Sequence, residues 1–222
     1  MTALQKQLPS LEKLNECTKF DGRSSQNQSH GYSFEDAVCL VFDFRDEDGN
    51  LWNQYGKDID VPATITAQSS LPEWARVDWS IKCCRWKKKI GYGTALKRFE
   101  ERTKPMVHCY AGWDKVNGSK QIVYFNYSLV TPLDAKKHWG NITMPLIESI
   151  DPCINRHHSI DYSKELTKIE NAKANGTYKF ANCSRHAHRT SNGYEVRNLQ
   201  VYVNHPPFMQ DIDDGQGLWY GT

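Results

Sequence analysis

The sequence predicts an α/β fold, in which a central mixed β-sheet is flanked by helices, with an α+β arrangement as the alternative. Apolar residues at helical spacing begin the chain, and runs that alternate between apolar and polar residues, as strands do, follow in its middle. Helical and extended patterns then alternate toward the end. With 222 residues, 39% of them hydrophobic and 12% aromatic, the composition predicts one globular domain over residues 1–222.

The N-terminal part is predicted to form two helices followed by a turn. Leucines at helical spacing predict the first helix over residues 2–19, and residues 20–31 are predicted to form a loop. Ser33 is positioned to cap a second helix, with Asp36 three residues later as in a capping box. Asp48-Gly49 then predicts a turn.

Two strands are predicted at the centre of the sheet. The first covers Asp58–Thr66, where Pro62 weakens the pattern because it lacks a backbone N–H. The second covers Arg76–Cys84 and alternates strictly, so Asp78, Ser80 and Lys82 share one face. The opposite face, with Val77, Trp79 and Ile81, is predicted to be buried.

The rest of the chain alternates between helices and strands, and its last residues are predicted to form a loop. The predicted elements are a helix over 91–104, strands over 106–113 and 121–130 joined by a turn at 116–119, helices over 131–138 and 163–175, and two short strands within 177–205 around a turn at 191–193.

The charge distribution and the cysteine content limit the classes of function that the protein can have. The net charge is only +2, but residues 82–104 hold nine basic residues and two acids, which favours binding of a polyanion on one face. A solvated helix surface is the alternative. The seven cysteines lack framework spacing and the N-terminus lacks an apolar core, so we expect a cytoplasmic protein with free thiols. The chain contains no apolar run long enough to predict a membrane span.

Acidic residues and a lysine stand near the two predicted central strands. Asp58 and Asp60 begin the first strand, and Lys82 lies on the second. Mg²⁺ prefers oxygen ligands such as carboxylates, and a nearby positive group stabilises charge on a reacting phosphate. The pattern therefore favours metal-dependent cleavage of a phosphodiester, although polar capping of a strand edge is the simpler alternative.

Three short segments resemble the PD-(D/E)xK nuclease superfamily, typified by type II restriction endonucleases. They are Glu35 in GYSFEDAV, Asp58 and Asp60 in GKDIDV, and Lys82 in WSIKCC. The resemblance implies a restriction-endonuclease-like fold and hydrolysis of DNA with Mg²⁺ or Mn²⁺. It also implies a metal ligand at Asp60 or Asp58, a charge-stabilising Lys82 and an acidic Glu35.

The chain departs from the superfamily at one position of the motif. Ser80 stands where the superfamily usually has an acid. The missing metal ligand is then expected from Asp78 on the same face, from Glu100 or Glu101 on the following helix, or from Glu35.

Two segments are expected to contact nucleic acid. Arginine and lysine neutralise phosphates, and an exposed aromatic ring stacks on a base. The first segment, CRWKKKIGYG, supplies Arg85, Trp86, Lys87, Lys88 and Lys89. The second is a predicted β-hairpin within 177–205, whose Arg185, Arg189, Asn192 and Arg197 are of the types that read base edges or hold phosphates. Ordinary solvated loops are the alternative for both.

A zinc site is a further alternative. Cys153, Cys183, His186 and His188 are chemically suitable ligands, but their spacing matches no familiar zinc finger.

The sequence as a whole favours a Mg²⁺-dependent DNA endonuclease. A homodimer is expected if the enzyme is sequence-specific, because two-fold DNA sites mirror two-fold proteins. The main alternative is a non-catalytic nucleic-acid-binding protein that uses the basic residues of 82–104. A nuclease acting on RNA and a protein-binding inhibitor also remain open.

Overall fold

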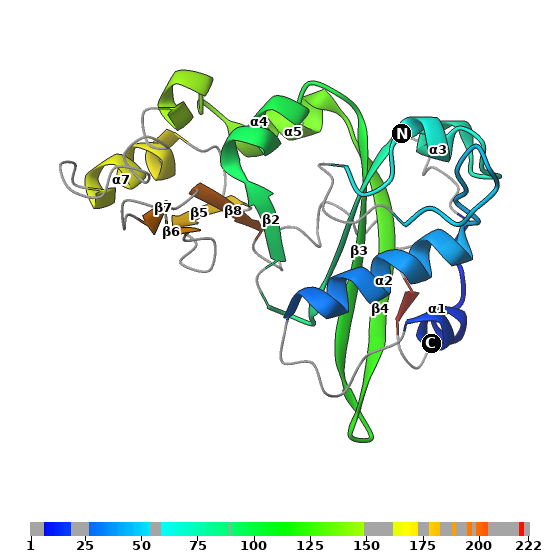
Figure 1. Cartoon of the computed structure of the whole chain (residues 1–222). Helices are drawn as coiled ribbons and strands as arrows, with labels where there is room; N and C mark the ends of the chain where they lie inside the picture. The colour runs from blue at the N-terminus through cyan, green and yellow to red at the C-terminus, as the bar shows by residue number, and fades with distance from the viewer. Residues whose placement is uncertain are drawn as a thin grey trace. The chain divides into compact units, whose positions relative to one another are not determined.

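The computed structural model describes residues 7–18, 27–53, 59–88, 90–148, 162–172, 178–182, 188–189, 195–196, 199–203 and 218–219. The chain divides into two compact units (Figure 1). Unit 1 comprises Met1–Lys88, Pro105–Val130 and Met209–Thr222, and unit 2 comprises Lys89–Lys104 and Thr131–Phe208. The expectation of a single domain stays a prediction.

Unit 1 is built on a mixed sheet. Its strands are β1 (Asp78–Arg85), β3 (Met106–Val116), β4 (Ser119–Val130) and β9 (Leu218–Trp219), in the spatial order β1-β3-β4-β9. β1 runs parallel to β3, whereas β3 with β4 and β4 with β9 are antiparallel. β3 and β4 form the long hairpin that runs down the centre of Figure 1. The predicted mixed sheet with flanking helices, and hence the α/β class, is confirmed.

Helices pack against this sheet because of their apolar faces. α2 (Asn27–Val41) packs on β1, and α1 (Leu11–Cys17) packs on β4. Phe34 and Val38 of α2 join Trp79 and Ile81 of β1 in one buried core. The predicted alternation of β1 is therefore confirmed on its apolar side. The short helix α3 (Ala63–Thr66) and a 3₁₀ turn (Glu73–Ala75) precede β1.

Unit 2 combines short strands with helices. β2 (Ile90–Thr94), β8 (Leu199–Val203) and β5 (Tyr178–Asn182) form an antiparallel sheet in that order, and β6 (His188–Arg189) pairs with β7 (Glu195–Val196). The helices are α4 (Ala95–Glu101), α5 (Pro132–Trp139) and α7 (Tyr162–Ala172). Phe99 of α4 packs edge-on against Trp139 of α5, with ring centroids 5.1 Å apart.

Several local predictions are confirmed. β1, β3, β4, α5 and α7 lie within one to three residues of their predicted positions, where the described residues reach. Turns occur at Asp48-Gly49 and at Asn117-Gly118, and both glycines have the positive φ that such turns require (81° and 83°). The side chains of Thr131 and Asp134 form a capping box at the start of α5.

The predicted strand over Asp58–Thr66 is wrong for its described residues. Only Val61 pairs with β1, through an isolated antiparallel bridge to Trp79. Pro62 then ends the pairing because it has no N–H to donate, and residues 63–66 form α3. The N–H of Ala63 donates to Asp78 Oδ1 at 2.7 Å, which fixes the start of this helix.

Four other boundaries are also wrong. The helix predicted over residues 2–19 covers only Leu11–Cys17 among the described residues 7–18, and Ser10 caps it. α2 begins at Asn27, inside the predicted loop, so Ser33 lies within the helix and does not cap it. The predicted helix over 91–104 begins as strand β2. Leu218–Trp219, predicted as loop, pairs with Phe125 and Tyr124 of β4. For β2 and for Leu218–Trp219, a partner strand distant in the sequence decides the local conformation, and no local propensity predicts that partner.

Among the described residues, no helix combines the length and the apolar character needed to span a bilayer.

We expect Gly112→Ala to destabilise the protein. A Cβ atom at Gly112 would lie 2.3 Å from Cε3 of Trp86, whose ring is stacked on Tyr124 (centroids 5.0 Å apart) and has little room to move. Overpacking of this kind costs about 1–3 kcal/mol, to be measured by urea denaturation. Gly91→Ala is the matched control, since a Cβ there meets nothing within 4 Å. Equal stability of the two variants would contradict the packing described.

Candidate active site

The Asp60 carboxylate is fixed at the edge of β1. Val61 and Trp79 exchange two backbone hydrogen bonds of 3.2 and 2.8 Å, and the backbone pairing stops there. The next N–H on this edge, that of Ile81, donates to Asp60 Oδ2 at 2.5 Å. An aspartate side chain thus takes the position that the backbone carbonyl of another strand would otherwise occupy.

Lys82 binds the same carboxylate oxygen. Its Nζ donates to Asp60 Oδ2 and to the backbone carbonyl of Ile81, each at 2.8 Å. The Lys82 and Asp60 side chains are only 21% and 14% exposed. Water therefore screens this ion pair less than it would screen a surface pair. Both hydrogen bonds reach Oδ2, and among the described residues nothing donates to Asp60 Oδ1.

Glu35 of α2 is the third charged group of the site. Burial, together with the negative charge of Asp60, raises the pKa of Glu35 from 4.5 to about 7, although Lys82 opposes the shift; Asp36 adds a smaller increase. Among the described residues, no group donates a hydrogen bond to its carboxyl. Glu35, Asp60 and Lys82, predicted as site residues from three separate segments, therefore lie close enough to affect one another electrostatically.

The other residues of β1's polar face have structural surroundings. Asp78 Oδ1 accepts the hydrogen bond from Ala63 that starts α3. Ser80 is 2% exposed, and its Oγ has no hydrogen-bond partner among the described residues. A buried hydroxyl without a partner is unfavourable by about 1–3 kcal/mol.

Two further acids, Asp58 and Glu100, were predicted as metal ligands. Asp58 is outside the described residues. Glu100 is an exposed residue of α4 in unit 2. Its neighbour Glu101 forms an ion pair with Arg98, with 2.8 Å between the two groups. Their roles as ligands stay predictions.

The basic segment after Lys82 is only partly exposed. Arg85, Lys87 and Lys88 are exposed, and Arg85 forms a 3.5 Å ion pair with Asp114 of β3. Trp86 stacks on Tyr124 with an interplanar angle of 30°, so one face of its ring is already used within the protein.

Most of the other predicted nucleic-acid contacts cannot be placed. Lys89, Arg185, Asn192 and Arg197 lie outside the described residues. Arg189 lies in β6, where its backbone is in register with Glu195. The reading of DNA by these residues stays a prediction.

Three thiols near the acids were not predicted as part of the site. They belong to Cys39, one helical turn after Glu35, Cys83 of β1 and Cys109 of β3; Cys39 and Cys109 are buried, and Cys83 is partly buried. Burial is the main cause that raises the pKa of each thiol, to about 12 for Cys39. The negative charge of Glu35 adds to the shift for Cys39 and Cys83, and that of Asp60 adds to it for Cys39 and Cys109. The thiols therefore stay neutral, and the carboxylates have weakly polar surroundings on this side. The only signal in the sequence is the four-residue spacing between Glu35 and Cys39.

Other candidate sites receive less support. Three of the four proposed zinc ligands, Cys153, Cys183 and His186, lie outside the described residues. Within the described ranges, no group of three or more His, Cys, Asp or Glu side chains is arranged to hold a metal ion.

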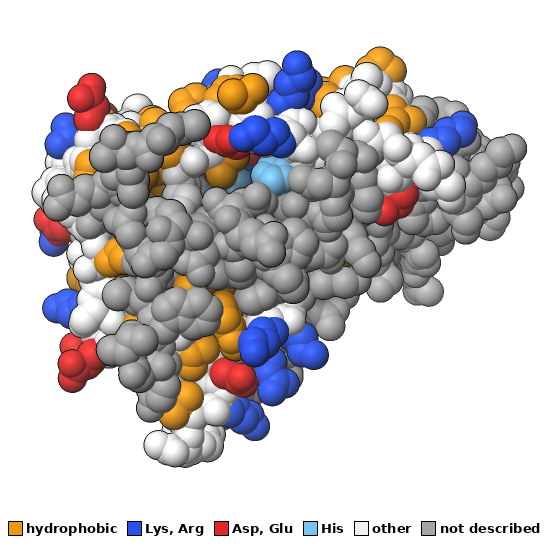
Figure 2. Space-filling view, turned by 180° about the vertical axis from the view of Figure 1, so that it is seen from behind, with side chains coloured by type: hydrophobic (Ala, Val, Ile, Leu, Met, Phe, Trp, Pro, Cys, Tyr) orange, Lys and Arg blue, Asp and Glu red, His pale blue; other side chains and the backbone are white. Residues whose placement is uncertain are grey.

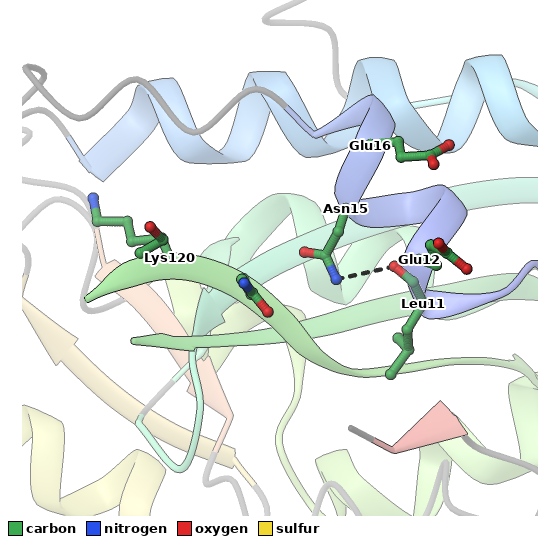
Figure 3. A pocket seen from close by; sticks show the side chains of 7 residues that line it. Leu11, Glu12, Asn15, Glu16 and Lys120 are labelled. Atoms are coloured by element: carbon green, nitrogen blue, oxygen red, sulfur yellow. Dashed lines mark hydrogen bonds between the residues drawn. The ribbon is translucent and has the colours of Figure 1, made fainter. Parts of the chain in front are cut away.

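A separate hollow of about 580 Å³ lies between α1 and the start of β4 (Figure 3). Glu12, Glu16 and Lys120 line it, together with Asn15, whose amide exchanges hydrogen bonds of 3.1 and 2.7 Å with the backbone of Ile122. Asn15 therefore serves to hold α1 against β4. None of the three charged site residues lines this hollow.

The acids of the site fit a hard divalent cation. Mg²⁺ is usually held in proteins by one or two carboxylates, with substrate phosphate and water completing its shell. Glu35 and Asp60 are two such carboxylates, and both have oxygen atoms that accept no hydrogen bond from the described residues. Burial and the negative charge of Asp60 hold the pKa of Glu35 near 7, and a cation between the two carboxylates would oppose both effects.

Comparisons of the chain with protein-family models, with curated proteins and with solved structures find no match.

Glu35 predicts a pH-dependent stability. In the folded protein Glu35 keeps its proton up to about pH 7, whereas the unfolded chain releases it near pH 4.5. The folded state therefore binds more protons in that interval, and stability falls as pH rises through it, by about 2–3 kcal/mol. Glu35→Gln should remove this loss in urea denaturation at pH 5 and pH 8. The exposed Glu47→Gln is the control, and a wild-type-like pH profile for Glu35→Gln would contradict the burial of Glu35.

Proposed function

We propose that this protein is a Mg²⁺-dependent endonuclease that hydrolyses phosphodiester bonds in DNA, with a fold like that of restriction endonucleases. One observation carries the proposal: Asp60 and Lys82 form an ion pair at the edge of β1, and both charges act on the buried carboxyl of Glu35 in α2, although the three residues are far apart in the sequence. Their order along the chain is also that of the superfamily motif. Two carboxylates beside a lysine suit the cleavage of a phosphodiester.

Asp60 and Glu35 are the residues that would hold the metal. When bound, Mg²⁺ supplies Lewis-acid activation of the phosphate and lowers the pKa of a coordinated water. Asp60 suits the role of main ligand because Ile81 and Lys82 fix its Oδ2 while Oδ1 accepts nothing from the described residues. Glu35 then substitutes for the acid that is missing at Ser80. Asp78 is less suited, since Ala63 already occupies one of its oxygens.

Lys82 supplies the positive charge next to the scissile phosphate. Its ammonium group has three N–H donors, and the two hydrogen bonds to Asp60 and Ile81 use two of them. The third can donate to a phosphate oxygen or orient the attacking water. Because these two hydrogen bonds already orient the ammonium group, it needs little rearrangement as charge develops on the phosphate.

The proposal includes a cellular location and an oligomeric state. We expect a cytoplasmic enzyme, consistent with the free thiols of the described cysteines. We also expect a homodimer, because two active sites are needed to cut both strands of a symmetric duplex site.

A non-catalytic nucleic-acid-binding protein is the second candidate. Two features favour it: Ser80 in place of the usual acid, and the three exposed basic residues at the end of β1, which are Arg85, Lys87 and Lys88. In that case the Asp60–Lys82 pair would serve only to close the edge of the sheet.

Asp60→Asn and Lys82→Met should each lower the DNA cleavage rate with Mg²⁺ by about 10²–10³-fold, because the first removes the charge of the main metal ligand and the second removes the positive charge beside the reacting phosphate. Asparagine keeps an oxygen that accepts from Ile81, so the edge of β1 should survive. DNA affinity in Ca²⁺ should change little. The measurements are gel cleavage of supercoiled plasmid and fluorescence anisotropy with labelled DNA.

Asp78→Asn is the matched control, since it changes one acid on the same strand and keeps an oxygen for Ala63. Equal loss of cleavage in Asp78→Asn and Asp60→Asn would contradict the assignment of Asp60 as main ligand. If the wild-type protein cuts no nucleic acid with any divalent metal, the non-catalytic alternative is favoured.

Millimolar Mn²⁺ should raise the Tm by roughly 2–8 °C, because a ligand that binds only the folded state stabilises it. The increase should be larger at pH 8 than at pH 6, since Glu35 must lose its proton to bind a cation. Differential scanning fluorimetry measures both values. A shift that persists undiminished in Asp60→Asn would show that Mn²⁺ binds elsewhere.

A further inference from the structure

Basic residues from two separate elements lie near the end of β1. Arg85 is the last residue of the strand, Lys87 and Lys88 follow it, and Lys115 lies near the tip of the β3–β4 hairpin. Arg85 is in register with Trp113, and the N–H of Trp86 donates to the carbonyl of Trp113 at 2.8 Å. Lys115 is only two residues beyond this contact. Figure 2 shows Lys and Arg side chains gathered around one acidic side chain near this hairpin.

The acid among them is already engaged. Asp114 Oδ1 accepts from the Lys115 N–H at 2.9 Å and pairs with Arg85 Nε at 3.5 Å. Four cations and this one carboxylate leave a net charge of +3. Arg85, Lys87, Lys88 and Lys115 are all exposed, and none of the three lysines forms an ion pair with a described residue. We call these four residues the basic end.

Two features of this region are unfavourable in the free protein. Lys115 stands directly opposite Lys120 on the antiparallel hairpin, and like charges in that position repel. Lys87 has φ = 61°, which is uncommon for a residue other than glycine. An anion bound across Arg85, Lys88 and Lys115 would offset the repulsion. Lys120 is not counted in the basic end because it shares the hollow of Figure 3 with Glu12 and Glu16.

We propose that the basic end binds the phosphate backbone of duplex DNA, and that the β3–β4 hairpin contributes Lys115 to this contact. The proposal rests on the proposed function, for which it supplies a second contact with the substrate. Arg85 lies three residues after Lys82, about 10 Å along the strand, so the two side chains start from opposite faces of β1. The basic end is therefore a separate contact with the DNA, next to the candidate active site and not within it. The contact is independent of base sequence, because only phosphates are bound.

Lys115→Ala tests the proposal. It should weaken binding of a labelled mixed-sequence duplex in Ca²⁺ by about 5- to 10-fold at 0.1 M salt and reduce the slope of log K against log salt by about 1. Because the substitution removes the repulsion with Lys120, the Tm of the free protein should stay unchanged or rise. Lost affinity together with a lower Tm would indicate a structural defect and would count against the proposal.

Lys13→Ala is the matched control, since Lys13 is an exposed lysine of α1 in the same unit and also forms no ion pair with a described residue. It should leave affinity and salt slope unchanged. Equal effects of the two substitutions would mean that net charge alone matters and would overturn the proposal. Binding of duplex RNA and of heparin should be measured in the same way. Binding of either one as tightly as DNA, with equal sensitivity to Lys115→Ala, would also overturn the assignment to DNA.

The two proposals can fail separately. If wild-type protein cuts DNA but Lys115→Ala binds and cuts normally, the basic end is wrong and the nuclease stands. If Lys115→Ala loses affinity but wild-type protein never cuts, the DNA-binding surface stands and the nuclease proposal fails.

Discussion

The candidate site depends on the hydrogen bond from the Ile81 N–H to the Asp60 carboxylate. This bond occupies the edge of β1 at the point where Pro62 has ended the backbone pairing after a single bridge. The same oxygen then binds Lys82, so one atom fixes both charges. Without it, the Ile81 N–H would need another acceptor, and Asp60 and Lys82 would no longer have fixed positions.

Burial makes this arrangement electrostatically strained. Glu35 is carried to the site by α2, whose apolar side chains pack on Trp79 and Ile81, and the neutral thiols of Cys39 and Cys109 lie nearby. Removal of water from Glu35 disfavours its charged form, and the negative charge of Asp60 adds to this effect, so the pKa of Glu35 rises. Packing of the core thus determines the protonation state of the acid. A divalent cation is the partner that would relieve the repulsion most directly.

The basic residues after Lys82 have a different physical basis. They are exposed, and their individual interactions with phosphate are weak and depend on salt. Their combined effect depends on how many basic residues there are and on the strands β1 and β3, which hold them near one another. Trp86, stacked on Tyr124 over Gly112, holds the end of β1 against β3 and so keeps Arg85 near the hairpin. In our proposals the buried site cuts the substrate and this surface positions it.

The sequence by itself determined the α/β class, the position of β1 and the long hairpin. These follow from local patterns: strict alternation and Asn-Gly and Asp-Gly turns. It also singled out Glu35, Asp60 and Lys82 as a predicted site, because their order along the chain resembles a nuclease motif. It could not give the α3 helix in place of a strand, the pairing of Leu218–Trp219, the buried thiols or the place of Lys115 beside Arg85. Each of these depends on a partner more than ten residues away. Only the tertiary structure brings such partners together, because packing of the core, which is not local, selects among conformations that the local sequence leaves nearly equal.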